Sequence, residues 1–249
     1  YMKKLIECVP NFSEGNDMHI IDQITAEIKA VEGVSLIDVD PGKATNRTVV
    51  TMVGTPEEVC EAAFRAVKKA SELIDMKKHK GAHPRFGATD VCPLVPVSNI
   101  TMEETVEYAR ALAKRIGEEL NIPVYCYENA AFAPERKNLA TCRAGEYEAL
   151  GERLSSEQWH PDFGPEERHP TAGTVAIGAR MPLVAYNINL NTPSLEIAHD
   201  IAKKIRFIGG GLRFCKAMGV ELKDRGITQV SMNLTDYSKT ALYRAFEMV

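Results

Sequence analysis

The residues best suited to chemistry lie in one short segment, residues 77–90. It holds two histidines four residues apart, His79 and His83, together with Arg85 and Asp90. Histidines at this spacing can form a zinc pair on a helix, but a glycine lies between them and a proline follows, and a helix tolerates neither well. The glutamate that follows the first histidine in zinc metalloproteases is also missing. We therefore expect a loop and no metal.

His83 is the side chain of this loop that is best placed to move protons. An imidazole has an unperturbed pKa of about 6.5, so it can accept and return a proton near neutral pH. Pro84 stiffens the backbone after it, Arg85 offers a planar grip on a carboxylate, and Gly87 permits a close backbone approach. A surface loop whose histidines cap turns is the alternative. The residues of the loop alone leave both interpretations open.

The elements around this loop predict an α+β fold. Short apolar and β-branched runs separated by turn residues predict strands at residues 5–9, 34–39, 48–53, 89–97 and 124–127. Capping residues followed by apolar residues at helical spacing predict helices at residues 18–31, 55–74 and 101–117. The order strand, helix, strand, strand, helix, strand is that of the ferredoxin-like arrangement, β-α-β-β-α-β.

The second half of the chain predicts a repeat of this arrangement. Residues 130–173 are rich in glycine, proline and charge and are expected to be a long connection. Strand material at residues 174–190 then begins a second strand–helix series. We predict two ferredoxin-like subdomains, residues 1–175 and 176–249, the second truncated at its C-terminus within its second helix. An open sheet and an incomplete second subdomain favour a homodimer.

The composition excludes several classes of protein. A net charge of −4, from 30 basic and 34 acidic residues, argues against a nucleic-acid binder that neutralises many phosphates. The six cysteines form no CxxC pair, so neither a disulfide framework nor a clustered zinc site is expected. No apolar run reaches about 18 residues, the length that spans a membrane. We expect a cytoplasmic protein that binds neither nucleic acid nor membrane.

Several longer motifs, spread over nearly the whole chain, resemble the formiminotransferase domain family. The segments that carry the resemblance are residues 7–15, 38–40, 45–48, 81–93, 143–150, 161–165 and 187–190. Members of this family occur alone or fused to a cyclodeaminase, which makes a cyclodeaminase an expected partner. The resemblance implies two ferredoxin-like α/β subdomains, in agreement with the predicted repeat.

The resemblance also implies a reaction and two sets of site residues. His83, in the Gly-x-His-Pro-Arg motif, would be catalytic. Folate would be bound by Gly164, Pro165, Glu166, Glu167, Arg168, His169, Pro170, Thr171, Ala172 and Gly173. The co-substrate tetrahydrofolate would accept at N5 a formimino group from N-formiminoglutamate. Formyl transfer from N-formylglutamate, and a folate-binding protein without turnover, are the alternatives.

Further residues could serve that reaction. Asp38 or Asp40 could orient the imidazole of His83, although a turn cap explains both acids as well. Cations suit the carboxylates of both substrates, and the candidates are Arg47, Arg85, Arg168 and Arg180. The polar loop after the first strand adds Asn11, Ser13 and Glu14, for which helix capping is the alternative. We predict that the catalytic residues are His83 and Asp40. The predicted substrate contacts are Asn11, Glu14, Arg47 and Arg85.

Overall fold

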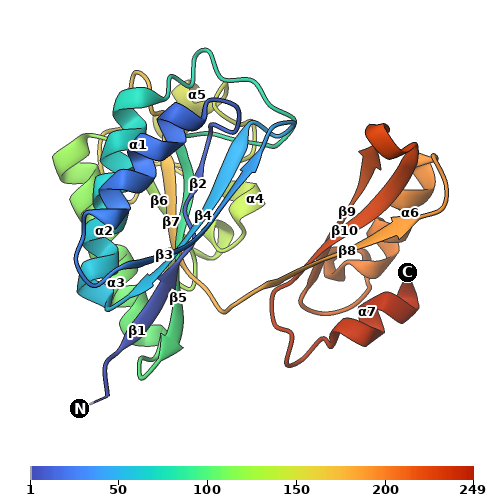
Figure 1. The fold of residues 1–249 in the computed structure, drawn as a ribbon. Coiled ribbons are helices and arrows are strands. Elements are labelled where there is room, and N and C mark those ends of the chain that lie inside the picture. Colours follow the sequence, from blue (N-terminus) through green and yellow to red (C-terminus); the bar gives the residue numbers. More distant parts are fainter. Residues whose placement is uncertain (1) are drawn as a thin grey trace. The chain divides into compact units, whose positions relative to one another are not determined.

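The computed structural model describes residues 2–249, apart from the side chain of residue 224, as a mixed α+β chain. It forms two compact units, one that ends at Arg180 and one from Met181 to Val249 (Figure 1). The division falls later than the boundary expected at residue 175, because the strand that follows residue 174 belongs to the first sheet. Each unit has its own hydrophobic core.

The first unit is built on one sheet of seven strands. These are β1 (Leu5–Cys8), β2 (Asn11–Phe12), β3 (Ser35–Gly42), β4 (Arg47–Gly54), β5 (Thr89–Ser98), β6 (Val124–Glu128) and β7 (Val175–Ala179). β1 and β2 follow each other along one line between β4 and β5, and β3 pairs with the far side of β4. These pairings are antiparallel, whereas β7 adds parallel to β5 and β6 adds parallel to β7.

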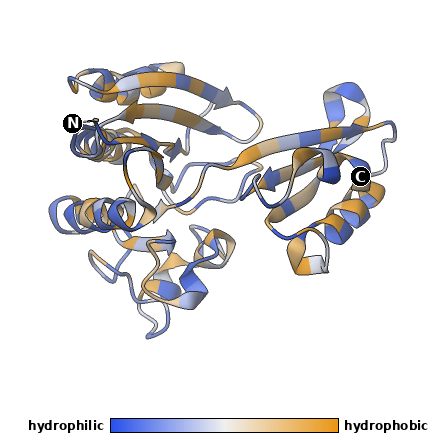
Figure 2. Ribbon diagram, turned by 90° about the horizontal axis from the view of Figure 1, so that it is seen from below, coloured by the Kyte–Doolittle hydropathy of each residue, from blue (hydrophilic) through white to orange (hydrophobic). Residues whose placement is uncertain are grey.

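Three helices pack against this sheet, α1 (Met18–Lys29), α2 (Pro56–Leu73) and α3 (Met102–Leu120). Their starts follow the predicted signals. Asp17 caps α1, Pro56 occupies the first turn of α2, and Thr101 and Glu104 form a reciprocal capping box at α3. Figure 2 shows hydrophobic and hydrophilic residues interleaved along these elements, as expected where one face is buried.

The segment predicted as a long connection carries more structure than its composition suggests. It contains η1 (Pro134–Arg136), α4 (Leu139–Cys142) and α5 (Leu150–Leu154). The buried guanidinium of Arg136 holds it together, pairing with Asp162 and donating to two backbone carbonyls, those of Gln158 and His160. Side-chain-to-backbone bonds of this kind leave no hydrophobic period in the sequence.

The second unit consists of β8 (Val184–Leu190), α6 (Leu195–Ile205), η2 (Phe207–Gly209), β9 (Cys215–Leu222), η3 (Lys223–Arg225), β10 (Ile227–Leu234) and α7 (Leu242–Met248). Its three strands form an antiparallel sheet in the order β8-β10-β9. The sequence did not predict β9, because Gly219 and charged residues interrupt its pattern. A Cβ atom at Gly219 would lie 2.7 Å from the backbone nitrogen of His199 in α6, so glycine lets the helix approach this strand.

Among the described residues, no helix combines the length and the apolar character that a bilayer span requires.

Candidate functional site

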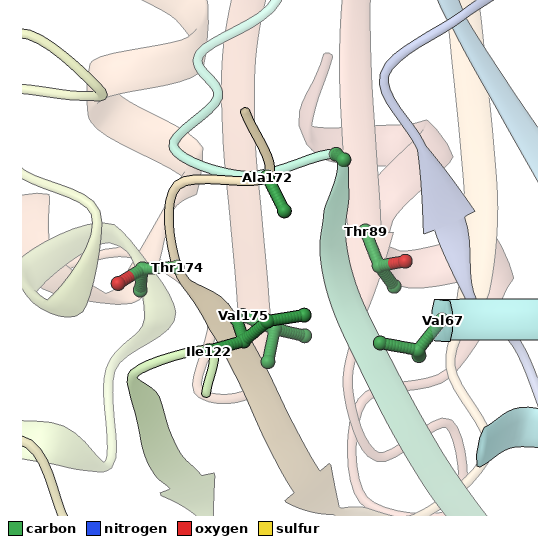
Figure 3. A pocket seen from close by; sticks show the side chains of 7 residues that line it. Val67, Thr89, Ile122, Ala172, Thr174 and Val175 are labelled. Carbon is green, nitrogen blue, oxygen red and sulfur yellow. The ribbon is translucent and has the colours of Figure 1, made fainter. Parts of the chain in front are cut away.

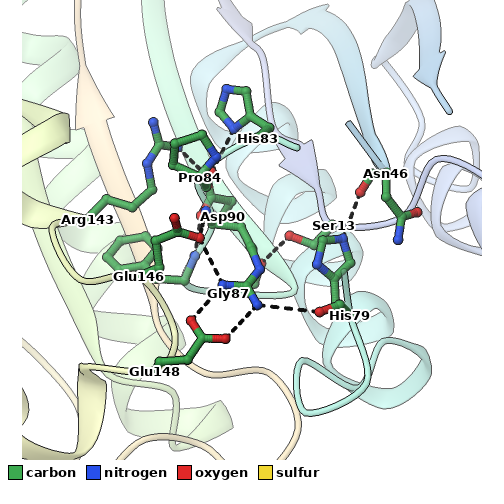
Figure 4. Close-up of polar contacts among 12 residues, drawn as sticks. Ser13, Asn46, His79, His83, Pro84, Gly87, Asp90, Arg143, Glu146 and Glu148 are labelled. Atoms are coloured by element: carbon green, nitrogen blue, oxygen red, sulfur yellow. Dashed lines mark hydrogen bonds and ion pairs between the residues drawn. The ribbon is translucent and has the colours of Figure 1, made fainter. Parts of the chain in front are cut away.

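His83 lies in the loop between α2 and β5, with its side chain partly buried. Its ring nitrogen Nδ1 is 2.7 Å from the carbonyl oxygen of Pro84 (Figure 4). A carbonyl oxygen can only accept a hydrogen bond, so the neutral ring carries its proton on Nδ1. The other nitrogen, Nε2, then presents a lone pair. The backbone thereby selects the tautomer that a general base requires.

The surroundings of His83 keep its ring neutral. Burial lowers the pKa of His83 to about 4, and the positive charges of Arg47 and Arg143 also lower it. The carbonyl of Pro84 and the carboxylate of Asp90 act in the opposite direction without restoring the ordinary value of 6.5. At neutral pH the imidazole is therefore uncharged and able to accept a proton.

A buried carboxylate beside His83 joins two arginines. Asp90 is fully buried, and its Oδ2 accepts hydrogen bonds from Nη1 of Arg47, at 2.6 Å, and from Nη1 of Arg143. Its Oδ1 accepts the backbone N–H of Phe86 at 2.8 Å. Burial acts to raise the pKa of Asp90, but the two guanidinium charges outweigh it and hold that pKa below its usual value. The cluster of Asp90, Arg47 and Arg143 thus carries a net charge of about +1.

Strand ends bring this cluster together. Arg47 begins β4, Asp90 is the second residue of β5, and Asn11 begins β2, which pairs with both strands. Nε of Arg47 donates to Oδ1 of Asn11 at 3.1 Å, and the amide of Asn11 donates to the carbonyl of Val9 at 2.9 Å. Two predicted substrate contacts, Asn11 and Arg47, therefore lie together, and the charge of Arg47 acts on the ring of His83.

A second histidine, His79, has a positioning role. Its Nε2 lies 2.8 Å from the carbonyl oxygen of Asn46, a residue in the left-handed backbone region with φ of 48°. The side chain of Asn46 accepts the N–H of Gly15 at 2.9 Å and donates to the carbonyl of Lys80 at 2.9 Å. These bonds join three loops and hold the histidine loop against the ends of β2 and β4.

The polar loop after β2 also has a positioning role. The hydroxyl of Ser13 donates to the carbonyl of Gly87 at 2.7 Å. The carboxylate of Glu14 accepts the backbone N–H groups of Asn16 and Asp17 at 2.8 and 2.9 Å. Glu14 thereby orders the turn just before α1, whose cap is Asp17. The predicted contact of Glu14 with substrate stays a prediction.

Arg85 forms ion pairs with two carboxylates of the same chain, those of Glu146 and Glu148. Nη1 and Nη2 each lie 2.8 Å from one carboxylate oxygen of Glu148, and Nη1 is 2.9 Å from Oε2 of Glu146. The hydrogen bond from Arg85 is the largest influence that lowers the pKa of Glu148, to about 2. The bidentate grip expected from this arginine is thus used to fix the loop that follows α4.

Asp38 and Asp40 lie apart from these contacts. Both are exposed on β3, the edge strand, which continues through Pro41 rather than ending at residue 39. Across residues 2–249 no hydrogen bond or ion pair joins either acid to His83, whose ring is oriented by the Pro84 carbonyl. The buried acid beside His83 is Asp90.

The expected folate segment joins the histidine loop at one end. The N–H of Ala88 donates to the carbonyl of Ala172 at 2.9 Å, and the N–H of Thr174 donates to that of Phe86 at 3.1 Å. A Cβ atom at Gly87 would lie 1.7 Å from the carbonyl oxygen of Thr174, so only glycine fits there. The prediction of a close backbone approach at Gly87 is confirmed.

Within the folate segment, the two ends differ in exposure. His169 closes a turn by accepting the N–H groups of Thr171 and Ala172 at Nδ1, at 3.3 and 3.1 Å. Ala172 and Gly173 are buried, whereas residues 166–168 are exposed. The guanidinium of Arg168 lies 4.9 Å from the centre of the Tyr147 ring.

Behind this junction lies packed core rather than a ligand cavity. Seven residues from α2, β5, β7 and the loops enclose a void too small for a water molecule (Figure 3). They are Val67, Ala88, Thr89, Ile122, Ala172, Thr174 and Val175. Ala172 and Ala88 therefore pack into this core and join the two loops.

Two matches that together cover nearly all of the chain decide its family. Residues 5–180 match the formiminotransferase domain, N-terminal subdomain, and residues 185–249 match the formiminotransferase domain. The chain belongs to the formiminotransferase domain family. The resemblance that the motifs indicated is confirmed.

Several formiminotransferase relatives are similar over the whole chain. A glutamate formimidoyltransferase of Streptococcus pyogenes serotype M1 is 53% identical over 248 residues, covering 100% of this chain and 83% of that protein. The glutamate formimidoyltransferase of Thermoplasma acidophilum is 49% identical over 98% of this chain and 81% of its own length. The formimidoyltransferase-cyclodeaminase of Mus musculus is 50% identical, and the chain spans 46% of that longer protein.

The formiminotransferase motifs contain two residues of this cluster to which the sequence assigned no specific role, Asp90 and Arg143. Each belongs to a segment that carries the resemblance, residues 81–93 and 143–150. Their contact joins residues 53 positions apart. A local pattern carries no information on such a pairing, although the charge of each residue within a family motif was an available signal.

Proposed function

We propose that this chain transfers the formimino group of N-formimino-L-glutamate to N5 of tetrahydrofolate, giving 5-formiminotetrahydrofolate and L-glutamate. Membership of the formiminotransferase domain family supports this, as does 53% identity with a protein named glutamate formimidoyltransferase. The structural observation that carries the proposal is the neutral His83 ring beside a cationic cluster. Its Nδ1–H is engaged by Pro84 and its Nε2 is available.

His83 acts as the general base and then as the general acid. N5 of tetrahydrofolate attacks the amidine carbon, and a C–N bond forms as N5 passes its proton to Nε2 of His83. The resulting imidazolium returns the proton to the glutamate nitrogen as the bond from that nitrogen to carbon breaks. Proton transfer of this kind contributes about 10²–10⁴-fold to a rate. Asp90 stabilises the transient imidazolium, since its negative charge favours the protonated ring.

Tetrahydrofolate meets the exposed part of the 164–173 segment. The backbone N–H groups of residues 166–168 donate no hydrogen bond to any other residue that the structure describes, so they are available to a ligand. Side chains of this stretch are charged and exposed, whereas Ala172 and Gly173 are buried against the histidine loop. We assign binding to the backbone of residues 164–170 and a positioning role to residues 171–173.

The pairing order supports a ferredoxin-like arrangement in both units. In the first, β3, β4, β1 and β5 lie side by side and antiparallel, with α1 and α2 as the two crossovers. In the second, β8, β10 and β9 pair in the corresponding order. The first strand of each repeat thus lies beside its third strand. A cytoplasmic location and a homodimer remain predictions.

A donor comparison tests the proposed function. The full chain is incubated with tetrahydrofolate and either N-formimino-L-glutamate or N-formyl-L-glutamate, and the folate product is identified by mass spectrometry. We expect 5-formiminotetrahydrofolate from the first donor. Product from the formyl donor alone would make the chain a formyltransferase. Folate binding without product from either donor would contradict catalysis.

A further inference from the structure

Arg143 is a largely buried cation whose hydrogen-bonding capacity is mostly unused. Its side chain is 12% exposed, and Nη1 donates to Asp90. Of the five N–H donors of a guanidinium, this is the only one that the structure pairs with another described residue. Its Nε is buried and has no partner among the residues described. Leaving a buried donor unpaired is unfavourable, so this geometry favours an external acceptor.

The neighbouring arginines are engaged by more partners than Arg143. Arg47 is bonded through Nη1 to Asp90 and through Nε to Asn11, and Arg85 is engaged by Glu146 and Glu148. Asp90 has to balance both Arg47 and Arg143, which leaves one positive charge without a counterion. The ligand that fits is therefore an anion with a planar, two-oxygen acceptor, and a carboxylate meets both requirements.

The position of Arg143 places such a carboxylate next to the reacting atoms. Arg143 is the C-cap residue of α4, and its backbone N–H donates to the carbonyl of Leu139 at 2.9 Å, which fixes its backbone. Figure 4 shows its side chain reaching toward Asp90 on the side of the cluster where His83 lies. Arg143 is also close enough to His83 for its charge to act on the ring.

We propose that Arg143 binds a carboxylate of the glutamate moiety of the formimino donor and so determines donor specificity. This inference rests on the proposed function and assigns part of its substrate recognition. The anchored carboxylate holds the amidine carbon within reach of His83. It also neutralises the uncompensated charge of the cluster, which makes protonation of the ring easier when the donor is present.

The test compares carboxylate recognition in the wild-type chain and in Arg143→Gln and Arg143→Lys. Initial rates are measured with N-formimino-L-glutamate and with its two monoamides, in each of which one carboxylate becomes a neutral amide. In the wild type we expect kcat/KM to fall by at least about 10-fold for one monoamide, as expected for a lost charged hydrogen bond. In Arg143→Gln that discrimination disappears, while KM for the donor rises by a similar factor. Arg143→Lys keeps a cation beside Asp90 but loses the planar pair of N–H donors of the guanidinium. We expect it to retain part of the discrimination that Arg143→Gln loses.

Controls separate the ways in which the inference can fail. Arg65→Gln, an exposed arginine of α2 paired with Glu61, should leave discrimination and KM unchanged. Discrimination that persists in both Arg143 variants would overturn the proposal, as would a weakened calorimetric Kd for tetrahydrofolate with an unchanged KM for the donor. That second result would assign the carboxylate to the folate tail. A wild type without turnover would contradict the proposed function itself, and calorimetric binding of the donor to each variant would then still test Arg143.

Discussion

Replacing Asp90 by asparagine tests how the site is held together. Asp90 is fully buried, and its two guanidinium partners have side chains that are 10% and 12% exposed. Removing one member of a buried ion pair destabilises a protein by about 3–5 kcal/mol, because the remaining charge stays desolvated. Asparagine keeps an oxygen that can accept the N–H of Phe86. We therefore expect Asp90→Asn to lower the free energy of unfolding by about 3 kcal/mol, the smaller end of this range.

The assay can follow the first unit alone. Trp159 is the single tryptophan of the chain, and its ring lies 5.9 Å, centre to centre, from that of Tyr125 in the first unit. Urea unfolding followed by tryptophan fluorescence therefore reports the unit that contains Asp90. Glu72→Gln is the matched control, because Glu72 pairs with Lys68 on an exposed helix surface. We expect the control to leave the unfolding midpoint unchanged.

The pH dependence of this difference has a defined sign. The pKa of Asp90 in the folded state lies below the ordinary aspartate value of 3.8. The stability that the carboxylate contributes is therefore fully present above about pH 3.8 and lost as pH falls through the folded-state pKa. The difference in unfolding free energy between wild type and Asp90→Asn should stay constant from pH 7 to pH 5. It should shrink only as the pH falls below about 3.8. A gap under about 1 kcal/mol at pH 7 would refute the role given to Asp90.

Two further predictions concern the histidine loop. His83→Ala should reduce turnover by at least about 10²-fold, with little change in the Kd for tetrahydrofolate measured by calorimetry; equal losses in both would make His83 a binding residue. Gly87→Ala should separate the histidine loop from the 164–173 segment, since the added Cβ meets the carbonyl of Thr174 at 1.7 Å. The midpoint of fluorescence-monitored unfolding should fall, and an unchanged midpoint would show that the two segments are not closely packed.

Much of the first unit was predictable because its signals are local. The inner stripe of α1 and the capping residues at the starts of α1 and α3 lie within a few residues of one another, and the structure confirms all three. The loop at residues 77–90 was predictable for the same reason, because glycine and proline exclude a helix over a short range. Signals of this kind depend only on residues that lie close together in the sequence.

Elements held by non-local or backbone contacts were not predictable. The segment from residue 130 to residue 173 depends on Arg136, whose partners are an aspartate and backbone carbonyls, and neither creates a hydrophobic period. β9 was missed because Gly219, which allows α6 to approach, weakens the strand pattern.

The site residues show the same difference between local and non-local signals. His83 could be singled out by its residue type and its loop, whereas its electrostatic partners could not. Asp90 contacts Arg47 and Arg143 across separations of 43 and 53 residues, and only the folded sheet brings them together. Asp40 lies exposed on an edge strand, where water screens a carboxylate and weakens its effect on an imidazole, and its catalytic role stays a prediction.

The most direct test of the neutral His83 ring is its titration in the free protein. The side-chain resonances of the six histidines can be followed by NMR between pH 3.5 and pH 8, with His83 assigned by its loss in His83→Asn. We predict a pKa of about 4, with the proton of the neutral ring on Nδ1. A pKa at or above the ordinary value of 6.5, or a neutral ring protonated on Nε2, would contradict the role of His83 as a ready base.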